Sequence, residues 1–273
     1  MPDPNTSRCL KLAALRHEHA HQLMGKAVRP IYYVDMDGYP LHEGSCVLVE
    51  IDEEKYVITA SHVIDASTKH DSALYIGGAD SLVEISGGDY LRSPRSGDNA
   101  NDDPYDFAVW KGSAQAIAAL GDLPYISSRQ FSLAPSTAAG NVYSVFGYPT
   151  TKNRFRQRKQ RRVKSQLWHY YSVTRDGAKA AEKMGVDGVH HIFIGYDKHS
   201  KWPNGRRIDS LKPQGASGGA LIDLGDCSDL ESARSDGEFV PKLAGIFIEH
   251  HNKVLISTRI GVILQSLQDA GYI

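Results

Sequence analysis

The chain has 273 residues and a formal net charge of −1, with 41% hydrophobic and 23% charged residues. That length is enough for one large or two small domains with a real hydrophobic core. The near-zero charge excludes a generally basic nucleic-acid-binding protein, and no apolar run reaches the roughly 18 to 20 residues that a membrane helix needs. We therefore expect a soluble globular protein with no membrane contact.

The N-terminus and the cysteines bear on the compartment. The first residues lack a basic stretch followed by an apolar core, so no signal peptide is expected. Cys9, Cys46 and Cys227 show neither metal-like nor disulfide-like spacing. Because secreted proteins of this size often carry several disulfides, both observations favour a reducing, cytoplasmic location.

Residues 8–24 carry good helix formers ahead of Gly25, and we expect an exposed N-terminal helix there. From Ile31 on, short segments rich in β-branched and aromatic residues are punctuated by Gly, Pro and Asp, a pattern typical of antiparallel all-β proteins. The expected strands include 31–34, 46–51, 56–60, 73–76, 107–110, 142–146, 191–196 and 243–248. The expected later helices are 113–120, 176–184 and 260–270.

Residues 152–164 depart from the average composition, since eight of these thirteen residues are Lys or Arg and none is acidic. Without them the chain has 23 basic against 32 acidic residues, a net charge of −9. The segment follows the turn signal Gly147-Tyr148-Pro149, so we expect a long exposed loop over 150–165. A solvated loop, contact with an acidic protein and contact with nucleic acid all stay open, although Phe155 is the only aromatic in the segment on which a base could stack.

Three short motifs carry candidate catalytic residues. T-A-S-H presents His62 after an apolar strand, D-F-A-V places Asp106 ahead of another strand, and G-A-S-G-G sets Ser217 among glycines. A serine hydroxyl needs a base to remove its proton, an imidazole titrates close to neutral pH, and a buried carboxylate fixes the imidazole tautomer. Glycines beside the serine let backbone N–H groups converge on a developing oxyanion. Asp102 and Asp103 compete with Asp106 as the acid, but Asp106 stands directly at the start of the apolar strand.

The order His62, Asp106, Ser217, separated by 44 and 111 residues, resembles the trypsin/chymotrypsin-like serine peptidases, and most of all their intracellular, disulfide-free bacterial branch. The resemblance covers residues 31–267 and implies an all-β fold of two antiparallel six-stranded β-barrels, with the active site in the cleft between them. It implies an N-terminal helical extension over 1–30, a first barrel over 31–128 and a second over 129–273. The first barrel then carries His62 and Asp106, and the second carries Ser217 and ends in the helix 260–270.

The same resemblance implies further site residues. The N–H groups of Gly215 and Ser217 form the oxyanion hole. The substrate pocket has an uncharged floor, and its residues are Leu211, Ile248, Glu249, His250 and Leu255. Ala216 stands where secreted members have an Asp that pairs with a new N-terminus after precursor cleavage, so that activation route is not expected.

The sequence therefore predicts a serine endopeptidase that hydrolyses peptide bonds of a protein or peptide substrate through an acyl-enzyme, with no cofactor and no metal ion. The alternative is a latent or inactive peptidase-like binding module that uses residues 152–164 to hold an acidic protein or nucleic acid.

A competing motif lies near the N-terminus. Residues 17–21, H-E-H-A-H, match the zinc-peptidase pattern H-E-x-x-H, in which His17 and His21 face the same way and Glu18 acts as the base. Only 16 residues precede His17, and no clear third ligand follows. We therefore expect a polar helix face there rather than a zinc site.

Overall fold

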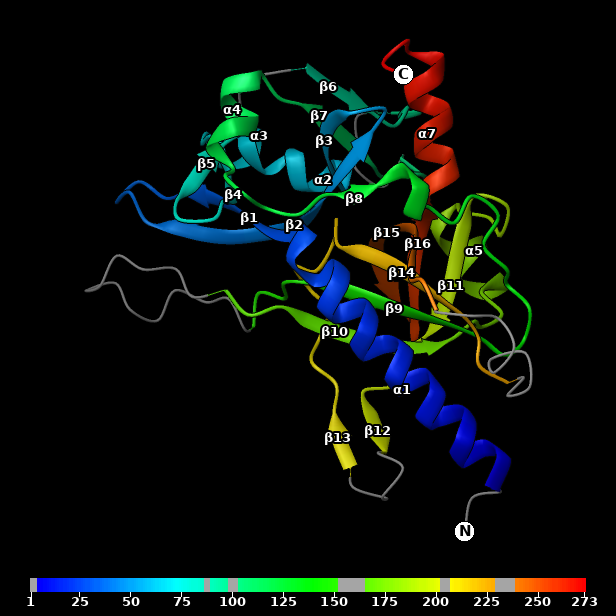
Figure 1. Ribbon diagram of the computed structural model, residues 1–273. Helices are drawn as coiled ribbons and strands as arrows, with labels where there is room; N and C mark the ends of the chain where they lie inside the picture. Colours follow the sequence, from blue (N-terminus) through cyan, green and yellow to red (C-terminus); the bar gives the residue numbers. More distant parts are fainter. Residues whose placement is uncertain (1–3, 86–88, 98–102, 152–164, 202–206, 229–238) are drawn as a thin grey trace.

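The computed structural model describes residues 4–85, 89–97, 103–151, 165–201, 207–228 and 239–273. Most of the elements are strands, which gather into two large sheets with a helix at each end of the chain (Figure 1). The all-β class and the two-sheet plan expected from the sequence are confirmed, and the two curled antiparallel sheets fit a chymotrypsin-like fold. The basic residues 152–164 lie outside the described residues.

The first sheet has the order β5-β4-β1-β2-β3-β7-β6, with β8 paired in parallel to β2. Its strands are β1 (Val28–Val34), β2 (Pro40–Ile51), β3 (Glu54–Thr59), β4 (Leu74–Gly77), β5 (Leu82–Glu84), β6 (Asp89–Arg92), β7 (Ala108–Lys111) and β8 (Ile126–Ser127). This sheet has eight strands rather than the expected six; the short strands β5 and β6 form its edges, and the two-residue strand β8 pairs with β2 outside the main order. The described residues of this half also form the short α-helices α2 (Ser61–Ile64), α3 (Ala66–His70) and α4 (Ala114–Ala119).

The second sheet has six strands in the order β10-β9-β14-β15-β16-β11. They are β9 (Asn141–Gly147), β10 (Trp168–Val173), β11 (His191–Gly195), β14 (Ala220–Asp226), β15 (Lys242–His251) and β16 (Val254–Arg259). Helix α5 (Ala178–Met184) lies between β10 and β11 in the chain, and α7 (Ile260–Asp269) follows β16 directly. A separate two-stranded pair joins β12 (His199–Lys201) to β13 (Arg207–Asp209).

Strand β2 shows how the core forms from the sequence. Val47 and Val49 point into a hydrophobic cluster that also contains Phe146 of the second sheet, whereas Cys46 and Leu48 point into a cluster within the first half. Successive side chains of a strand face opposite ways, so a continuous apolar run can serve two cores at once. The first cluster lies between the two sheets and holds them together.

Helix α1 (Pro4–Met24) is not the exposed helix that the sequence predicts. Ala13, His17, Ala20 and Met24 are buried at intervals of three or four residues, which is one face of a helix. This face packs on the second sheet, and Figure 1 shows α1 running across β9 and β10. The prediction was wrong because alanines and a histidine form the buried stripe, and they mark it less clearly than leucines do. No helix in the described ranges is both long and apolar enough to cross a bilayer.

Candidate active site

Short helix α2 carries His62 at the end of β3, and two arginines hold this helix in place. Arg92 donates to the carbonyl of Ser61 (2.6 Å) and to Asp65 Oδ1 (2.6 Å). Arg95 donates to Ser61 Oγ (2.9 Å) and to Asp65 Oδ2 (2.7 Å). Burial alone would raise the pKa of the Asp65 carboxyl, but the two guanidinium groups hold that pKa below its usual value. The charged network therefore keeps both flanks of His62 in position.

His62 and Asp106 are joined by two hydrogen bonds. The ring Nδ1 lies 2.6 Å from Asp106 Oδ2, and the His62 backbone N–H donates to Oδ1 at 2.9 Å. A carboxylate only accepts, so Nδ1 carries the hydrogen and Nε2 keeps its lone pair. The His62 side chain is 38% exposed and the Asp106 side chain 13%, so the ring remains accessible while the acid is largely covered.

The pKa of His62 is raised above its usual value. Burial works in the opposite direction, because it penalises the imidazolium. The hydrogen bond to Asp106 and the charge of that carboxylate outweigh burial, and the charges of Glu249 and Asp65 add to them. The site therefore stabilises the protonated form of His62. A general base needs this stabilisation because it carries a proton during the reaction.

Asp106 has a left-handed backbone, with φ of +45°, and Asp103 supports this conformation. Asp103 Oδ1 accepts from the N–H groups of Tyr105 (3.2 Å) and Asp106 (2.8 Å), and its Oδ2 accepts from Ser93 Oγ (2.6 Å). Asp103 thus closes the turn that presents Asp106, and Asp106 is the carboxylate that contacts His62. The spacing Asp-x-x-Asp is a turn signal that the sequence analysis did not use.

Main-chain hydrogen bonds to both sheets hold the loop that carries Ser217. The N–H of Ser45 on β2 donates to the Ser217 carbonyl at 2.8 Å, and the N–H of Gly218 donates to the carbonyl of Phe247 on β15 at 2.7 Å. Gly215 and Gly218 have φ of +89° and +84°. A Cβ on Gly218 would lie 2.0 Å from the Ser45 carbonyl oxygen, so no larger residue fits this approach.

The Ser217 loop lies against the segment that carries His62. A Cβ on Gly44 would meet both a methyl group of Val63 (2.6 Å) and the Ser217 carbonyl oxygen (3.3 Å), so Gly44 lets these two residues come together. A Cβ on Gly218 would lie 3.0 Å from the Ala60 nitrogen. The described residues include no hydrogen bond between the Ser217 hydroxyl and the His62 ring.

The N–H groups of Gly215 and Ser217, expected to form an oxyanion hole, donate no hydrogen bond to another described residue. The neighbouring N–H of Ala216 is engaged, since it donates to the Pro213 carbonyl at 2.8 Å. His42 borders Gly215, with its Cε1 3.0 Å from the position of a Gly215 Cβ. Burial lowers the pKa of His42 to about 4, so this ring is neutral at pH 7. Sequence reasoning missed His42, because nothing in its local pattern links it to residue 215.

Of the five residues expected to line a substrate pocket, four lie on the paired strands β15 and β16. Leu211 and Leu255 share a hydrophobic cluster, whereas the side chain of Ile248 belongs to another. Glu249 and His250 are exposed on β15. His250 is opposite Leu255 in the strand register, and its ring lies 4.6 Å from that of Tyr196, whose hydroxyl donates to the Leu211 carbonyl. The structure therefore links Leu211, His250 and Leu255, and the part of all five residues in a substrate pocket stays a prediction.

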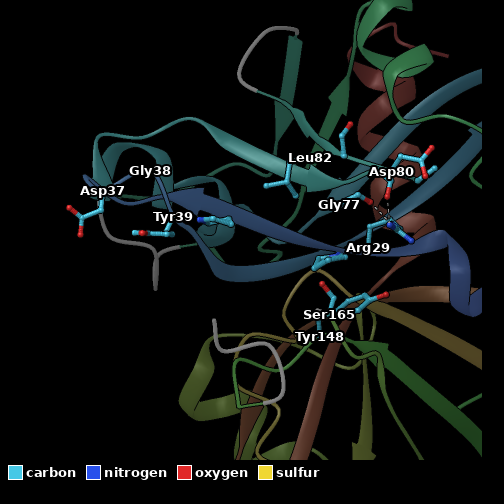
Figure 2. Close-up of a pocket in the computed structure, with 14 residues that line it drawn as sticks. Arg29, Asp37, Gly38, Tyr39, Gly77, Asp80, Leu82, Tyr148 and Ser165 are labelled. Carbon is cyan, nitrogen blue, oxygen red and sulfur yellow. Dashed lines mark hydrogen bonds between the residues drawn. The ribbon is translucent and has the colours of Figure 1, made fainter. Parts of the chain in front are cut away.

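Two cavities of the structure lie away from His62, Asp106 and Ser217. The larger, of about 920 Å³, is bordered by Arg29, Gly77 and Asp80 on one side and by Tyr148 and Ser165 on the other (Figure 2). Arg29 donates to the carbonyls of Gly77 (2.5 Å) and Gly78 (2.6 Å), so its charge is already engaged. The smaller cavity, of about 550 Å³, lies beside α5 and β11. His62, Asp106 and Ser217 line neither of them.

His17 and His21 of the H-E-x-x-H motif face the second sheet, whereas Glu18 is exposed. His17 Nδ1 bonds to Ser144 Oγ (2.8 Å), and His17 Nε2 lies 2.7 Å from Nδ1 of His169. Glu18 accepts from Gln22 on the same helix. Burial, together with the charges of His169 and His21, lowers the pKa of His17 to about 3. The expected polar face is therefore wrong for His17, and the described residues contain no group of three or more potential ligands placed to hold a metal ion.

The fold and this arrangement of residues define a chymotrypsin-like architecture with a serine, a histidine and an aspartate gathered where the two sheets meet. Among solved structures, the chain is similar to an HtrA-type protease solved with a tripeptide, at 17% identity and a TM-score of 0.48. The match covers 93% of this chain and 62% of that protein. No family model and no curated protein matches the sequence. A likeness at this level says nothing about activity, which has to be inferred from the residues of this chain.

Proposed function

We propose that the protein is a serine endopeptidase in which Ser217 is the nucleophile, His62 the general base and acid, and Asp106 the group that orients His62. The observation that carries this proposal is the pair of hydrogen bonds from His62 to Asp106. They place the hydrogen on Nδ1 and leave Nε2 able to accept a proton. This is the tautomer that a general base for Ser217 requires.

The proposed reaction proceeds through an acyl-enzyme. His62 Nε2 takes the proton of Ser217 Oγ as that oxygen attacks the scissile carbonyl, and the N–H groups of Gly215 and Ser217 receive the oxyanion. The imidazolium then gives its proton to the leaving amine, and water releases the acyl group by the same steps in reverse. Asp106 stabilises the imidazolium throughout, which agrees with the raised pKa of His62.

Covalent labelling with a fluorophosphonate tests this assignment. We expect the folded protein to be modified at Ser217, mapped by mass spectrometry, and the heat-unfolded protein to remain unmodified. Ser217→Ala should abolish labelling and peptide hydrolysis, whereas Ser81→Ala, at an exposed serine outside the site, should change neither.

The alternative is a latent or inactive peptidase-like binding module. The observation in its favour is that the Ser217 hydroxyl and the His62 ring are not hydrogen-bonded, although such bonds are often long in unliganded enzymes and tighten on binding. If the folded protein resists the probe and hydrolyses no peptide, the enzyme assignment is wrong and the binding module gains support.

A further inference from the structure

Two buried side chains of the second sheet hold the loop that carries Asp106. Thr258 on β16 and His191 on β11 are opposite each other in the strand register, and both are almost fully buried. Thr258 Oγ1 donates to the carbonyl of Tyr105 at 2.5 Å. His191 Nε2 lies 2.8 Å from the carbonyl of Pro104, and its Nδ1 lies 3.0 Å from the carbonyl of Asp187. One cross-strand pair thus reaches two consecutive carbonyls of the first half.

The Thr258 contact falls on the peptide unit that leads into Asp106. The carbonyl of Tyr105 and the N–H of Asp106 belong to one planar group, so the two ends cannot turn independently. Thr258 binds the carbonyl end, and Asp103 Oδ1 accepts from the N–H end at 2.8 Å. Fixing both ends fixes the plane, and with it the direction from which the Asp106 side chain leaves the backbone.

This fixation matters because Asp106 has a left-handed backbone conformation. A φ of +45° is uncommon for a residue with a Cβ, and such strain persists only where the surroundings over-determine it. The Asp106 carbonyl also accepts from the N–H of Ser61 at 3.2 Å. Without the hydroxyl of Thr258, the Tyr105 carbonyl would lose its donor, and only the N–H end of this peptide would still be held, by Asp103.

We propose that Thr258 is a positioning residue, supported by His191, through which the second sheet sets the Asp106 carboxylate against His62. This inference rests on the proposed peptidase function and adds to it that the acid–base pair is correctly aligned only when the two halves are docked. Thr258 contacts neither His62 nor the nucleophile and acts through the Tyr105–Asp106 peptide.

The matched variants Thr258→Val and Thr258→Ser test the proposal. Valine keeps nearly the same shape and lacks the hydroxyl, whereas serine keeps the hydroxyl. We expect Thr258→Val to lower kcat about tenfold with little change in KM, since a small misplacement of a catalytic group has effects of this order. Thr258→Ser should recover most of the activity. A role in overall stability alone would lower activity only in proportion to the folded fraction, which a urea titration of each variant measures.

The titration of His62 gives a second measurement that needs no turnover. Asp106 raises the pKa of His62, so a displaced carboxylate should lower it, while Glu249 and Asp65, which also raise it, are unchanged. We expect NMR titration in the Ser217→Ala background to show a lower His62 pKa with Thr258→Val and an unchanged one with Thr258→Ser. If Thr258→Val does not fold, His191→Phe removes the contact with the Pro104 carbonyl while keeping an aromatic ring beside Tyr105, and it should shift the pKa of His62 in the same direction.

The two proposals fail in different ways. A wild-type protein that is inert to fluorophosphonate, but whose His62 pKa falls with Thr258→Val, contradicts the peptidase function and leaves the positioning role standing. A Thr258→Val protein with wild-type kcat and wild-type His62 pKa overturns the positioning role, whatever the wild type hydrolyses. The positioning role is also overturned if Thr258→Ser changes kcat and the pKa as much as Thr258→Val does.

Discussion

The acid–base pair and the nucleophile loop are built in different ways. His62 and Asp106 are joined by direct side-chain hydrogen bonds, and a surrounding shell of charged residues holds their elements. The Ser217 loop instead depends on backbone geometry, with two left-handed glycines and main-chain bonds to β2 and β15. Charged hydrogen bonds therefore hold the His62–Asp106 pair in place, whereas backbone conformation holds the Ser217 loop.

This difference predicts which substitutions the acid–base pair and the Ser217 loop each tolerate. Substitutions that change the charge or tautomer of the His62–Asp106 pair, without moving the backbone, should lower activity. In the Ser217 loop, substitutions that add side-chain volume without changing charge should lower activity. Three substitutions separate these sensitivities, and they follow in order of expected effect.

The largest effect is expected from Asp106→Asn. An amide can donate to His62 Nδ1, which would move the hydrogen to Nε2 and leave that nitrogen unable to accept the serine proton. The same change in the chymotrypsin-type template lowers kcat about 10⁴-fold, and we expect a loss of this order at pH 7. Steady-state hydrolysis and fluorophosphonate labelling measure it. Asp122→Asn, at an exposed position, is the control, and an Asp106→Asn protein retaining a tenth of wild-type kcat would contradict the assigned role.

Gly218→Ala should have the next largest effect. The added methyl group would overlap the Ser45 carbonyl, and the residue would keep a left-handed φ at a cost of about 1–3 kcal/mol. We expect labelling at Ser217 to slow at least about tenfold because the loop must shift. Gly185→Ala is the matched control, since Gly185 also has a positive φ but has open space around it. Equal labelling rates in the two variants would show that the close approach to Ser45 is unimportant.

The smallest effect is expected from Glu249→Gln. The charge of Glu249 helps to raise the pKa of His62, so neutralising it should lower that pKa. A general base works in its neutral form, and activity is therefore lost as pH falls through the His62 pKa. The acidic limb of kcat/KM should move to lower pH, with little change near pH 8. Glu182→Gln, on the exposed side of α5, should leave the limb in place, and a shift to higher pH for Glu249→Gln would refute the electrostatic account.

Much of the fold follows from local patterns. Short runs of β-branched and aromatic residues between turn residues predicted strands that the structure contains, for example at 46–51 and 142–146. These two runs are almost entirely apolar because both faces of each strand are buried. The Gly-rich motif around Ser217 and the strand start at Asp106 likewise mark backbone geometry that a few neighbouring residues determine. The motifs therefore named the residues that the structure gathers where the two sheets meet, although their catalytic roles stay a prediction.

Contacts between distant segments could not be predicted in this way. The face of α1 that binds the second sheet is made of alanines and His17, whose partners Ser144 and His169 lie more than a hundred residues away. Thr258 reaches the Asp106 loop across 153 positions, and His42 of the first sheet borders Gly215. Such contacts depend on strand register and on how the two sheets dock. The residues next to one another in the sequence determine the local backbone conformation. Which distant residues come into contact is determined only when the strands pair and the complete core packs.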